Sequence, residues 1–441
     1  MKVKRTGKFK VKASHPDYET IKVHTIEAKE IYNYSNYIIR QLYFKNSGNH
    51  KYSLEFIHEY PELLEDFNSY LSEKSQFTST FYRIICTFSR IKEHSLNSKM
   101  VQGIVNILKR DWKSYWKLLK LKAEGKYDKN VSIPRYKKKY SIVEYNPQVI
   151  SKIKLKNGYV GTVGMKKGFK IPKFYREYNC KSARALWKND SLYMEIIYEK
   201  EVPETKSNKK VASIDLGGKI LMTVAYNFNR RGICISANML RSLNHYYNKI
   251  IGTMTSLLPK DIKISKAIKN LWRKREEQIR NLIGYYTNRL IEELKTLEIT
   301  KLIIGKNKEQ KQEINLHSKL ENRNFCLIPF NKLIEILKYK CEEHGIECIE
   351  QEESYTSKAS FLNDDYIPVY GIEDKEYEFF GWRNGRTYKI KGKNQKIHAD
   401  LNGALNIMRK AGYEFIENVS FLNNNWIFPI GKYKVKNLSY N

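Results

Sequence analysis

The order of strands and helices in the second half of the chain restricts its possible folds more than any other feature. The stretch "KVASIDLGGKILMTVAYN" predicts a buried strand, a glycine turn and a second strand, and "GICISAN" predicts a third. A long helical pattern then covers about residues 264–297, and the buried strand "ITKLIIG" follows it. The helix "PFNKLIEILKYKCEEHG", which Gly345 ends, and the strand "IECIEQEE" complete the series.

This series predicts a mixed α/β sheet in the strand order of an RNase H-like nuclease core. An irregular segment comes after the fifth strand. It leads into the helix "IHADLNGALNIMRK", residues 397–410, which has Leu401, Leu405 and Met408 on one face. We expect this apolar face to pack the last helix against the sheet.

The first 205 residues predict a different architecture. Residues 1–30 and 123–205 have strand patterns, with "SIPRYKKKYSIVEYN" and "SLYMEIIYEKEV" as examples, whereas residues 31–122 have helical spacing. We therefore expect a β-barrel-like module that is interrupted by a helical insertion. The polar linker "PETKSNKK", residues 203–210, joins it to an α/β domain formed by residues 206–353 and 398–441, with an irregular insertion at 354–397.

The charge indicates a polyanionic partner. The chain has 80 Lys and Arg against 47 Asp and Glu, a net charge of +33, and 33 tyrosines lie among the cations. A polyanion relieves such self-repulsion, and aromatic rings between cations suit RNA or single-stranded ligands. An A+T-rich genome also enriches Lys and Tyr but does not explain the shortage of acids, and membrane-surface binding is the weaker alternative. With no long apolar run and no signal-peptide core, we expect a cytoplasmic protein.

Two aspartates stand where a nuclease core would place its acids. Asp215 ends the buried strand "VASID", where Gly217 and Gly218 let the chain turn away, and Asp400 begins the last helix. Carboxylates that meet from separate elements suit Mg²⁺, and two such ions hydrolyse phosphodiesters. Each aspartate also has an ordinary explanation: an Asp before Gly often forms a turn, and an Asp at a helix start often caps it.

Four motifs carry a family resemblance. "SIDLGG", "IIGKNKEQKQEINL", "EESYTSKASFLND" and "HADLNGALNIMRKAG", in this order and spacing, resemble the TnpB family of transposon-encoded RNA-guided nucleases, which are related to the type V CRISPR effectors. The resemblance covers most of residues 210–412, and "IPRYKKK" is similar to a basic segment of the family.

The resemblance has several implications. The α/β domain is expected to be a RuvC-like nuclease, and the N-terminal module a wedge domain with a helical recognition insertion at 31–122. The expected function is cleavage of double-stranded target DNA beside a short flanking motif, guided by a transposon-derived RNA and using two Mg²⁺ ions. The expected particle is a monomeric ribonucleoprotein associated with the nucleoid.

The family's site uses Asp, Glu and Asp, and the resemblance implies that Asp215, Glu353 and Asp400 are both catalytic and metal-binding. Many members have a glutamate where the strand "KLIIG" carries Gly305. A subgroup that resembles the Fanzor relatives instead has a glutamate ahead of "TSK", which here is Glu353.

The middle acid has two alternatives. Glu352 stays open, because a shift of one residue turns a strand side chain to the other face. Glu309, in the loop after "KLIIG", is the more distant alternative, since its ordinary explanation is a solvated loop acid.

The insertion also departs from the family. Members usually carry paired cysteines there, but residues 359–397 contain none, and Ala359 stands where a cysteine is often found. The six cysteines of the chain form no CxxC pair either, so a zinc ribbon is doubtful. We expect aromatic packing to hold the insertion instead, through Phe361, Tyr370, Phe379, Phe380 and Trp382.

Three groups of cations are candidates for nucleic-acid contacts. A predicted strand carries one group around Tyr136, the long helix carries the second, and the insertion carries the third, beside the expected site. The helix group is favoured because guanidinium groups bind phosphate bidentately, whereas a charge run can equally be a solvated surface. The candidates are Arg135, Lys137, Lys138, Lys139, Arg273, Lys274, Arg275, Arg280, Arg289, Lys358 and Arg386.

Two other functions remain open. A TnpB descendant that represses transcription under RNA guidance would be expected to have lost its site acids, whereas all three candidates are present here. A DNA-joining transposase with an RNase H-like core would need no RNA. Neither a transposon nor a CRISPR context follows from the chain alone.

Overall fold

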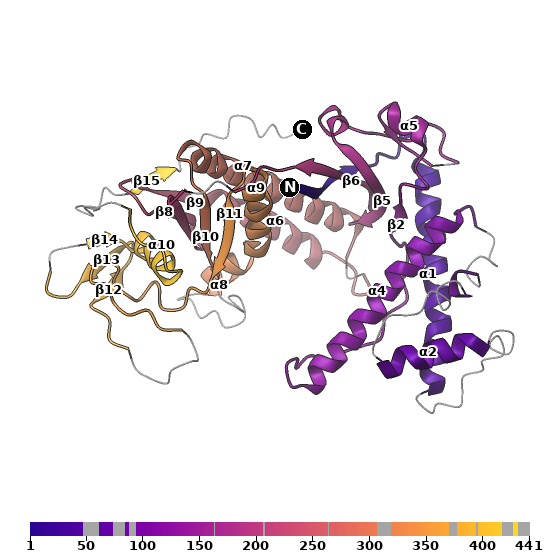
Figure 1. The fold of residues 1–441 in the computed structure, drawn as a ribbon, viewed down its shortest axis with the longest axis horizontal. Helices are drawn as coiled ribbons and strands as arrows, with labels where there is room; N and C mark the ends of the chain where they lie inside the picture. The colour runs from indigo at the N-terminus through magenta and orange to yellow at the C-terminus, as the bar shows by residue number, and fades with distance from the viewer. Residues whose placement is uncertain are drawn as a thin grey trace. The chain divides into compact units, whose positions relative to one another are not determined.

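The structure is a computed structural model of the 441-residue chain, which folds into two compact units, Lys2–Glu201 and Val202–Asn441 with Met1 (Figure 1). The residues that it describes are 1–46, 61–73, 84–87, 94–162, 164–205, 208–262, 264–306, 319–369, 377–393, 396–416 and 427–430.

The N-terminal unit has an antiparallel sheet in the order β1-β6-β5-β2. These strands are β1 (Lys2–Lys10), β6 (Ser191–Glu201), β5 (Asn179–Lys188) and β2 (Val143–Tyr145). A small hairpin pairs β3 (Tyr159–Val160) with β4 (Phe169–Lys170). The helices are α1 (Tyr18–Asn46), α2 (Pro61–Glu73), α4 (Ser98–Ala123) and α5 (Lys152–Lys156), with the 3₁₀ helix η2 (Lys173–Glu177). The core lies between α1, α4 and the sheet, around the buried Tyr32, Trp112 and Tyr145.

Two predictions about this unit are wrong. Residues 18–30 are helix rather than strand: their β-branched residues favour a strand, but Ile21, Ala28 and Ile31 are buried at helical spacing, so packing overrides propensity. Residues 135–139 are not a strand either. The Asn33 side chain on α1 accepts from the Lys137 amide at 2.7 Å and donates to the Lys137 carbonyl at 2.9 Å. These backbone groups therefore bond to a helix side chain and not to a neighbouring strand.

The C-terminal unit contains a six-stranded sheet in the order β11-β10-β7-β8-β9-β15. The strands are β7 (Val211–Leu216), β8 (Ile220–Tyr226), β9 (Gly232–Ser236), β10 (Lys301–Gly305), β11 (Glu347–Gln351) and β15 (Ile427–Ile430). The strands β7, β8 and β9 are antiparallel, β10 runs parallel to β7 and β11 parallel to β10. The five predicted strands and the mixed α/β class are therefore confirmed, while β15 was not predicted.

Helices cover both faces of this sheet (Figure 1). Ala212, Ile214 and Leu216 share a core with α7 (Lys266–Thr296) and α9 (Phe330–Glu343). On the other face Ser213 Oγ donates to the Ala404 carbonyl of α10 (Ala399–Lys410) at 2.6 Å. The predicted long helix is confirmed as α7, whereas α6 (Asn238–Ser256) and α8 (Lys319–Cys326) were not predicted.

The insertion contributes a small antiparallel sheet of β12 (Gly381–Asn384), β13 (Thr387–Ile390) and β14 (Lys396–His398), which leads directly into α10.

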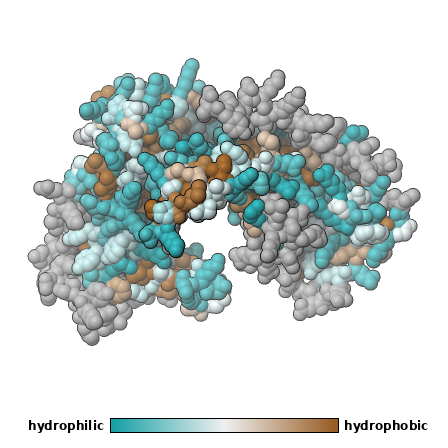
Figure 2. All heavy atoms as spheres, turned by 180° about the vertical axis from the view of Figure 1, so that it is seen from behind, coloured by the Kyte–Doolittle hydropathy of each residue, from teal (hydrophilic) through white to brown (hydrophobic). Residues whose placement is uncertain are grey.

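Hydrophilic residues cover most of the described surface in Figure 2. Among the described residues, no helix combines the length and apolar character that a membrane crossing needs.

Candidate active site

Asp215 reaches the α10 face of the sheet. Side chains alternate along a strand, so Asp215 shares its face with Ser213. The backbone of α10 comes so close that a Cβ atom on Gly403 would lie 2.8 Å from Asp215 Oδ2. Burial and the charge of Asp400 raise the pKa of Asp215 to about 7, which Arg383 partly opposes. Gly403 therefore lets α10 pack directly against this carboxyl group.

Glu353 follows β11 by two residues, rather than ending the strand as its sequence suggested. Its carboxylate fills the space beside Gly305 of the neighbouring β10: a Cβ atom on Gly305 would overlap Glu353 Oε2 and lie 2.5 Å from Ile407 Cδ1. Burial, then the charges of Asp215 and Glu352, raise the pKa of Glu353 to about 8. A carboxylate from the loop after β11 thus stands where a side chain at position 305 would begin.

Glu352 has a different environment. Its Oε2 pairs with Lys410 Nζ at 2.5 Å, and its Oε1 accepts from the Ser354 amide at 2.7 Å. Burial alone would raise the pKa of Glu352, but these hydrogen bonds hold it below the ordinary value. Glu309 lies outside the described residues. Of the two described candidates, only Glu353 adjoins Gly305 and carries a raised pKa that includes repulsion from Asp215.

Asp400 lies in the first turn of α10 but does not cap it. His398 occupies the N-cap position, with no side-chain capping bond. Asp400 Oδ1 instead pairs with Arg383 Nη2 of β12 at 2.8 Å, and the aspartate side chain is only 17% exposed. The helix-cap explanation of Asp400 is therefore wrong.

The chemistry of these acids fits a hard divalent cation. Oxygen ligands are what Mg²⁺ prefers, and two of the three carboxyl groups have a raised pKa because they are buried and repel each other. As they stand, no three His, Cys, Asp or Glu side chains in the described part of the chain converge on a common metal position.

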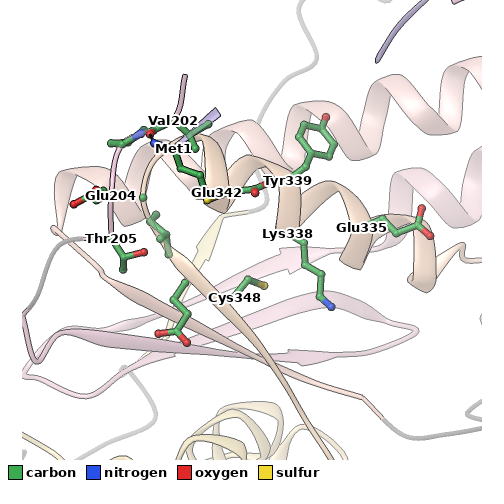
Figure 3. Close-up of a pocket in the computed structure, with 13 residues that line it drawn as sticks. Met1, Val202, Glu204, Thr205, Glu335, Lys338, Tyr339, Glu342 and Cys348 are labelled. Atoms are coloured by element: carbon green, nitrogen blue, oxygen red, sulfur yellow. Dashed lines mark hydrogen bonds between the residues drawn. The ribbon is translucent and has the colours of Figure 1, made fainter. Parts of the chain in front are cut away.

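A separate surface pocket lies beside α9 and β11 (Figure 3). Its lining includes Glu204, Glu335, Glu342 and Lys338, but none of the three candidate acids. The pocket is therefore not the candidate active site.

Three of the five predicted cations on α7 have partners within the unit. Arg273 Nη1 contacts both carboxylate oxygens of Glu277 at 3.0 Å, and Arg275 donates twice to Asn244 Oδ1, at 2.6 and 3.0 Å. The third, Arg289, pairs with a glutamate one turn on, at 3.0 Å. Lys274 is exposed and Arg280 is half-buried. Two of these pairs lie within α7 itself, whereas Arg275 joins α7 to α6.

The remaining predicted cations also divide. Lys137 pairs with Asp111 at 3.3 Å, whereas Arg135 and Lys138 are exposed; Lys139 lies 4.0 Å from Asp190. Lys358 and Arg386 are exposed on the insertion. Arg383, in contrast, contacts Asp400, and the sequence did not indicate it because the pairing of β12 with β13 brings it to α10.

A basic surface of the N-terminal unit was also missed. Lys170, Lys173 and Arg176 line one recess, and Phe174, which follows Lys173 in the chain, is 59% exposed. Among the described residues, Lys170 and Lys173 have no ion-pair partner, and Arg176 Nε donates to the Ile171 carbonyl at 2.9 Å. The stretch "FKIPKFYREY" could have indicated this surface, since cations and aromatics alternate in it.

The aromatic packing expected in the insertion is only partly present. Phe361 packs against Phe415, with ring centroids 5.6 Å apart. Phe380 and Trp382, in contrast, are 61% and 49% exposed, so the prediction is wrong for them. Tyr370 lies outside the described residues.

The sheet order and the likeness to a solved structure define the class of fold, which is the mixed α/β fold of a Cas12 effector. The chain resembles Cas12f1 in a complex with sgRNA and target DNA, with 15% identity, a TM-score of 0.53, and coverage of 88% of this chain and 82% of that one. Residues 195–311 match the OrfB IS605 family, described as a probable transposase, and residues 330–407 match the Cas12f1-like TNB domain. A TnpB-like protein, ORF457 of Acidianus two-tailed virus, is 25% identical over 362 residues, which are 70% of this chain and 72% of that protein. Together these similarities in sequence and fold support a protein of the TnpB type.

Proposed function

We propose that the chain is an RNA-guided DNA endonuclease of the TnpB type, with Asp215, Glu353 and Asp400 as its catalytic acids. The observation that carries the proposal is the fit between Glu353 and Gly305: a carboxylate stands beside β10 where the strand itself has no side chain. Mutual repulsion links Asp215 to both other acids. The three carboxyl groups, from β7, the loop after β11 and α10, are thus linked through Asp215, and we call them the acid cluster.

Burial and mutual repulsion of its carboxyl groups favour cation binding by the acid cluster. Each buried carboxylate raises the free energy of its neighbours, so binding a cation there relieves both burial and repulsion. Asp215, Glu353 and Asp400 would hold two Mg²⁺ ions. Bound ions of this kind activate water and stabilise the leaving oxygen of a phosphodiester. Gly305 and Gly403 give the carboxylates of Glu353 and Asp215 their room, and Arg383 orients Asp400.

The partners follow from charge and from the exposed surfaces. A net charge of +33 suits a guide RNA together with target DNA. In the N-terminal unit, the recess of Lys170, Lys173 and Arg176 would hold phosphates while Phe174 stacks on an unpaired base. Such contacts supply affinity, whereas base pairing with the guide would supply sequence specificity.

Sequencing the RNA that co-purifies with the protein tests the class of function. The expected result is one dominant species with a structured part and a variable end. A protein that purifies free of RNA would favour a DNA-joining transposase. A protein that retains guide and target but leaves the DNA intact in Mg²⁺ would favour a repressor.

A further inference from the structure

The insertion is attached to α10 without the ligands of a zinc ribbon. Structural zinc sites use Cys and His, and residues 359–397 contain neither. The chain therefore does not fit the zinc ion that its family resemblance suggests, and something else must hold this segment in place.

Asp365 joins two separate parts of the insertion. This residue is buried, and its Oδ2 accepts from the Ser360 amide at 2.7 Å and from the Phe380 amide at 3.0 Å. A carboxylate that accepts two backbone N–H groups makes charge-assisted bonds, which are stronger than neutral ones. One side chain thus connects the loop after the "TSK" turn to the start of the small sheet.

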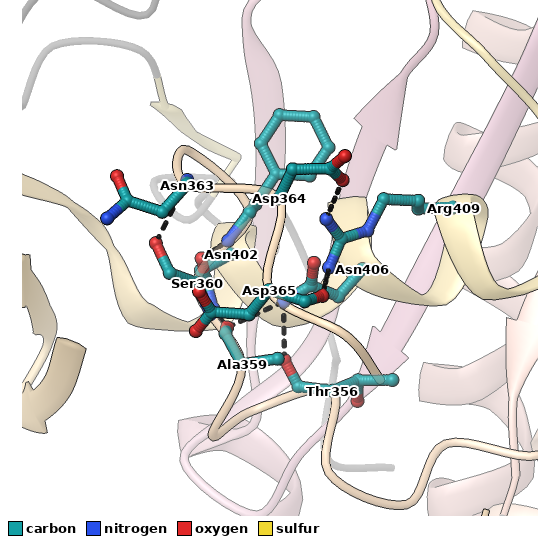
Figure 4. A network of polar contacts seen from close by, with 10 residues as sticks. Thr356, Ala359, Ser360, Asn363, Asp364, Asp365, Asn402, Asn406 and Arg409 are labelled. Atoms are coloured by element: carbon teal, nitrogen blue, oxygen red, sulfur yellow. Dashed lines mark hydrogen bonds and ion pairs between the residues drawn. The ribbon is translucent and has the colours of Figure 1, made fainter. Parts of the chain in front are cut away.

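Two asparagines of α10 hold the same loop (Figure 4). Asn402 accepts from the Phe361 amide at 2.9 Å and donates to the Ala359 carbonyl at 2.8 Å. Asn406 donates to the carbonyls of Thr356 and Ala359 at 2.9 and 2.7 Å. Both asparagines are fully buried, where a lost partner leaves a polar group unsatisfied. We call Asp365, Asn402 and Asn406 the Asp–Asn clamp.

The clamp is connected to Asp400 through β12 and through α10. Phe380, which Asp365 holds, accepts from the Lys391 amide at 2.8 Å, and β12 begins at the next residue. Arg383 of this strand then reaches Asp400 at 2.8 Å. Asp400 itself lies on the helix that carries both asparagines. The same contacts therefore fix the insertion and the position of Arg383.

We propose that the Asp–Asn clamp fixes the insertion to α10 without a metal ion, and that Asp365 is a positioning residue for Arg383 and Asp400. The metal-free attachment follows from the clamp alone. The consequence for cleavage rests on the proposed function.

The first test measures the zinc content of the full-length protein and its thermal unfolding with and without a zinc chelator. The expected results are well under one zinc per chain and an unchanged unfolding midpoint. A stoichiometric zinc ion, whose removal unfolds the protein, would overturn the proposal.

The second test measures hydrogen exchange at the Ser360 and Phe380 amides. Asp365→Ala should speed their exchange about tenfold or more, as the loss of a buried hydrogen bond predicts. Asp365→Asn keeps an acceptor oxygen and should restore most of the protection. The matched control is Asp364→Asn: this neighbouring acid is 87% exposed, and asparagine tolerates its left-handed backbone conformation of φ 54°. Equal exchange in Asp365→Ala and Asp364→Asn would contradict the clamp.

If Asp365→Ala does not fold, Asn402→Ala and Asp365→Asn allow the same comparison at the Phe361 and Phe380 amides. Cleavage of matched DNA gives a separate readout: Asp365→Ala should lower the cleavage rate at saturating DNA more than it lowers DNA affinity. Because zinc content and exchange do not depend on cleavage, a failure of the clamp is distinguishable from a failure of the proposed nuclease function.

Discussion

Replacing Gly305 by alanine tests whether Glu353 stands beside β10. The added Cβ would lie 2.5 Å from Ile407 Cδ1 and would overlap Glu353 Oε2, well inside the 3.0 Å that real Cβ atoms keep. Overpacking a core costs about 1–3 kcal/mol, whereas replacing glycine in a tolerant strand gains only about 0.4–1 kcal/mol. The clash should therefore dominate, and we expect a net loss of stability of about 1–2 kcal/mol.

The effect on cleavage should be larger than the effect on stability. Relief of the clash must move the Glu353 carboxylate, and a displacement of about 1 Å at a catalytic group can cost on the order of 100-fold in rate. The assays are thermal unfolding and cleavage of matched DNA by the reconstituted ribonucleoprotein. Gly252→Ala on α6 is the control, because nothing lies within 4 Å of its Cβ position. Its stability should rise slightly, with cleavage unchanged.

A double-mutant cycle makes the argument specific to Glu353. In a Glu353→Ala background, Gly305→Ala should cost less stability than in the wild type, since one of its two clashes has gone. Wild-type unfolding and cleavage by Gly305→Ala would show that the Glu353 carboxylate does not lie beside β10.

Three further predictions concern pH, the insertion and RNA. Folding raises the pKa of Asp215 from 3.8 to about 7, so the contribution of this carboxyl group to stability is present below pH ~4 and is lost as the pH rises through 7. In chelator, Asp215→Asn should therefore match the wild type near pH 4 and unfold at a higher temperature near pH 8. Equal unfolding midpoints of the two proteins at both pH values would contradict this prediction. Arg383→Ala should reduce cleavage more than Arg386→Ala while costing at most about 1 kcal/mol of stability, because the Arg383–Asp400 pair is partly exposed; equal cleavage by the two variants would count against it. Phe174→Ala should weaken binding of the co-purified RNA about 5- to 100-fold, with Phe174→Trp near wild type, as a gel-shift titration would measure; unchanged affinity would remove Phe174 from the RNA surface.

The sheet could be predicted from the sequence because its signals are local. Buried strands with glycine turns mark β7 and β8, and the helix that Gly345 ends precedes β11, so the strand order followed from the chain order alone. The beginning of α1 could not be predicted, because Ile21 and its neighbours favour a strand until the core of the N-terminal unit selects helical spacing. Local patterns succeed where local and tertiary preferences agree.

The candidate site was only partly predictable for a similar reason. The motif ahead of "TSK" indicated Glu353, but its relation to Gly305 depends on the parallel pairing of β10 with β11. Arg383 and Asp365 act through a hairpin and a folded loop, and no spacing in the sequence announces such contacts. The aromatic residues of the insertion predicted aromatic packing, but Phe380 and Trp382 are exposed and polar side chains hold the segment instead.

The proposed RNA-guided nuclease activity can be measured as cleavage, in Mg²⁺, of DNA matched to the variable end of the co-purified RNA. The wild-type complex should cut this DNA and leave unmatched DNA intact. The Asp215→Ala and Glu353→Ala complexes should bind the matched DNA without cutting it, whereas Glu352→Ala should still cut. Cutting by Asp215→Ala would exclude the proposed site, and cutting that needs no RNA would exclude RNA guidance.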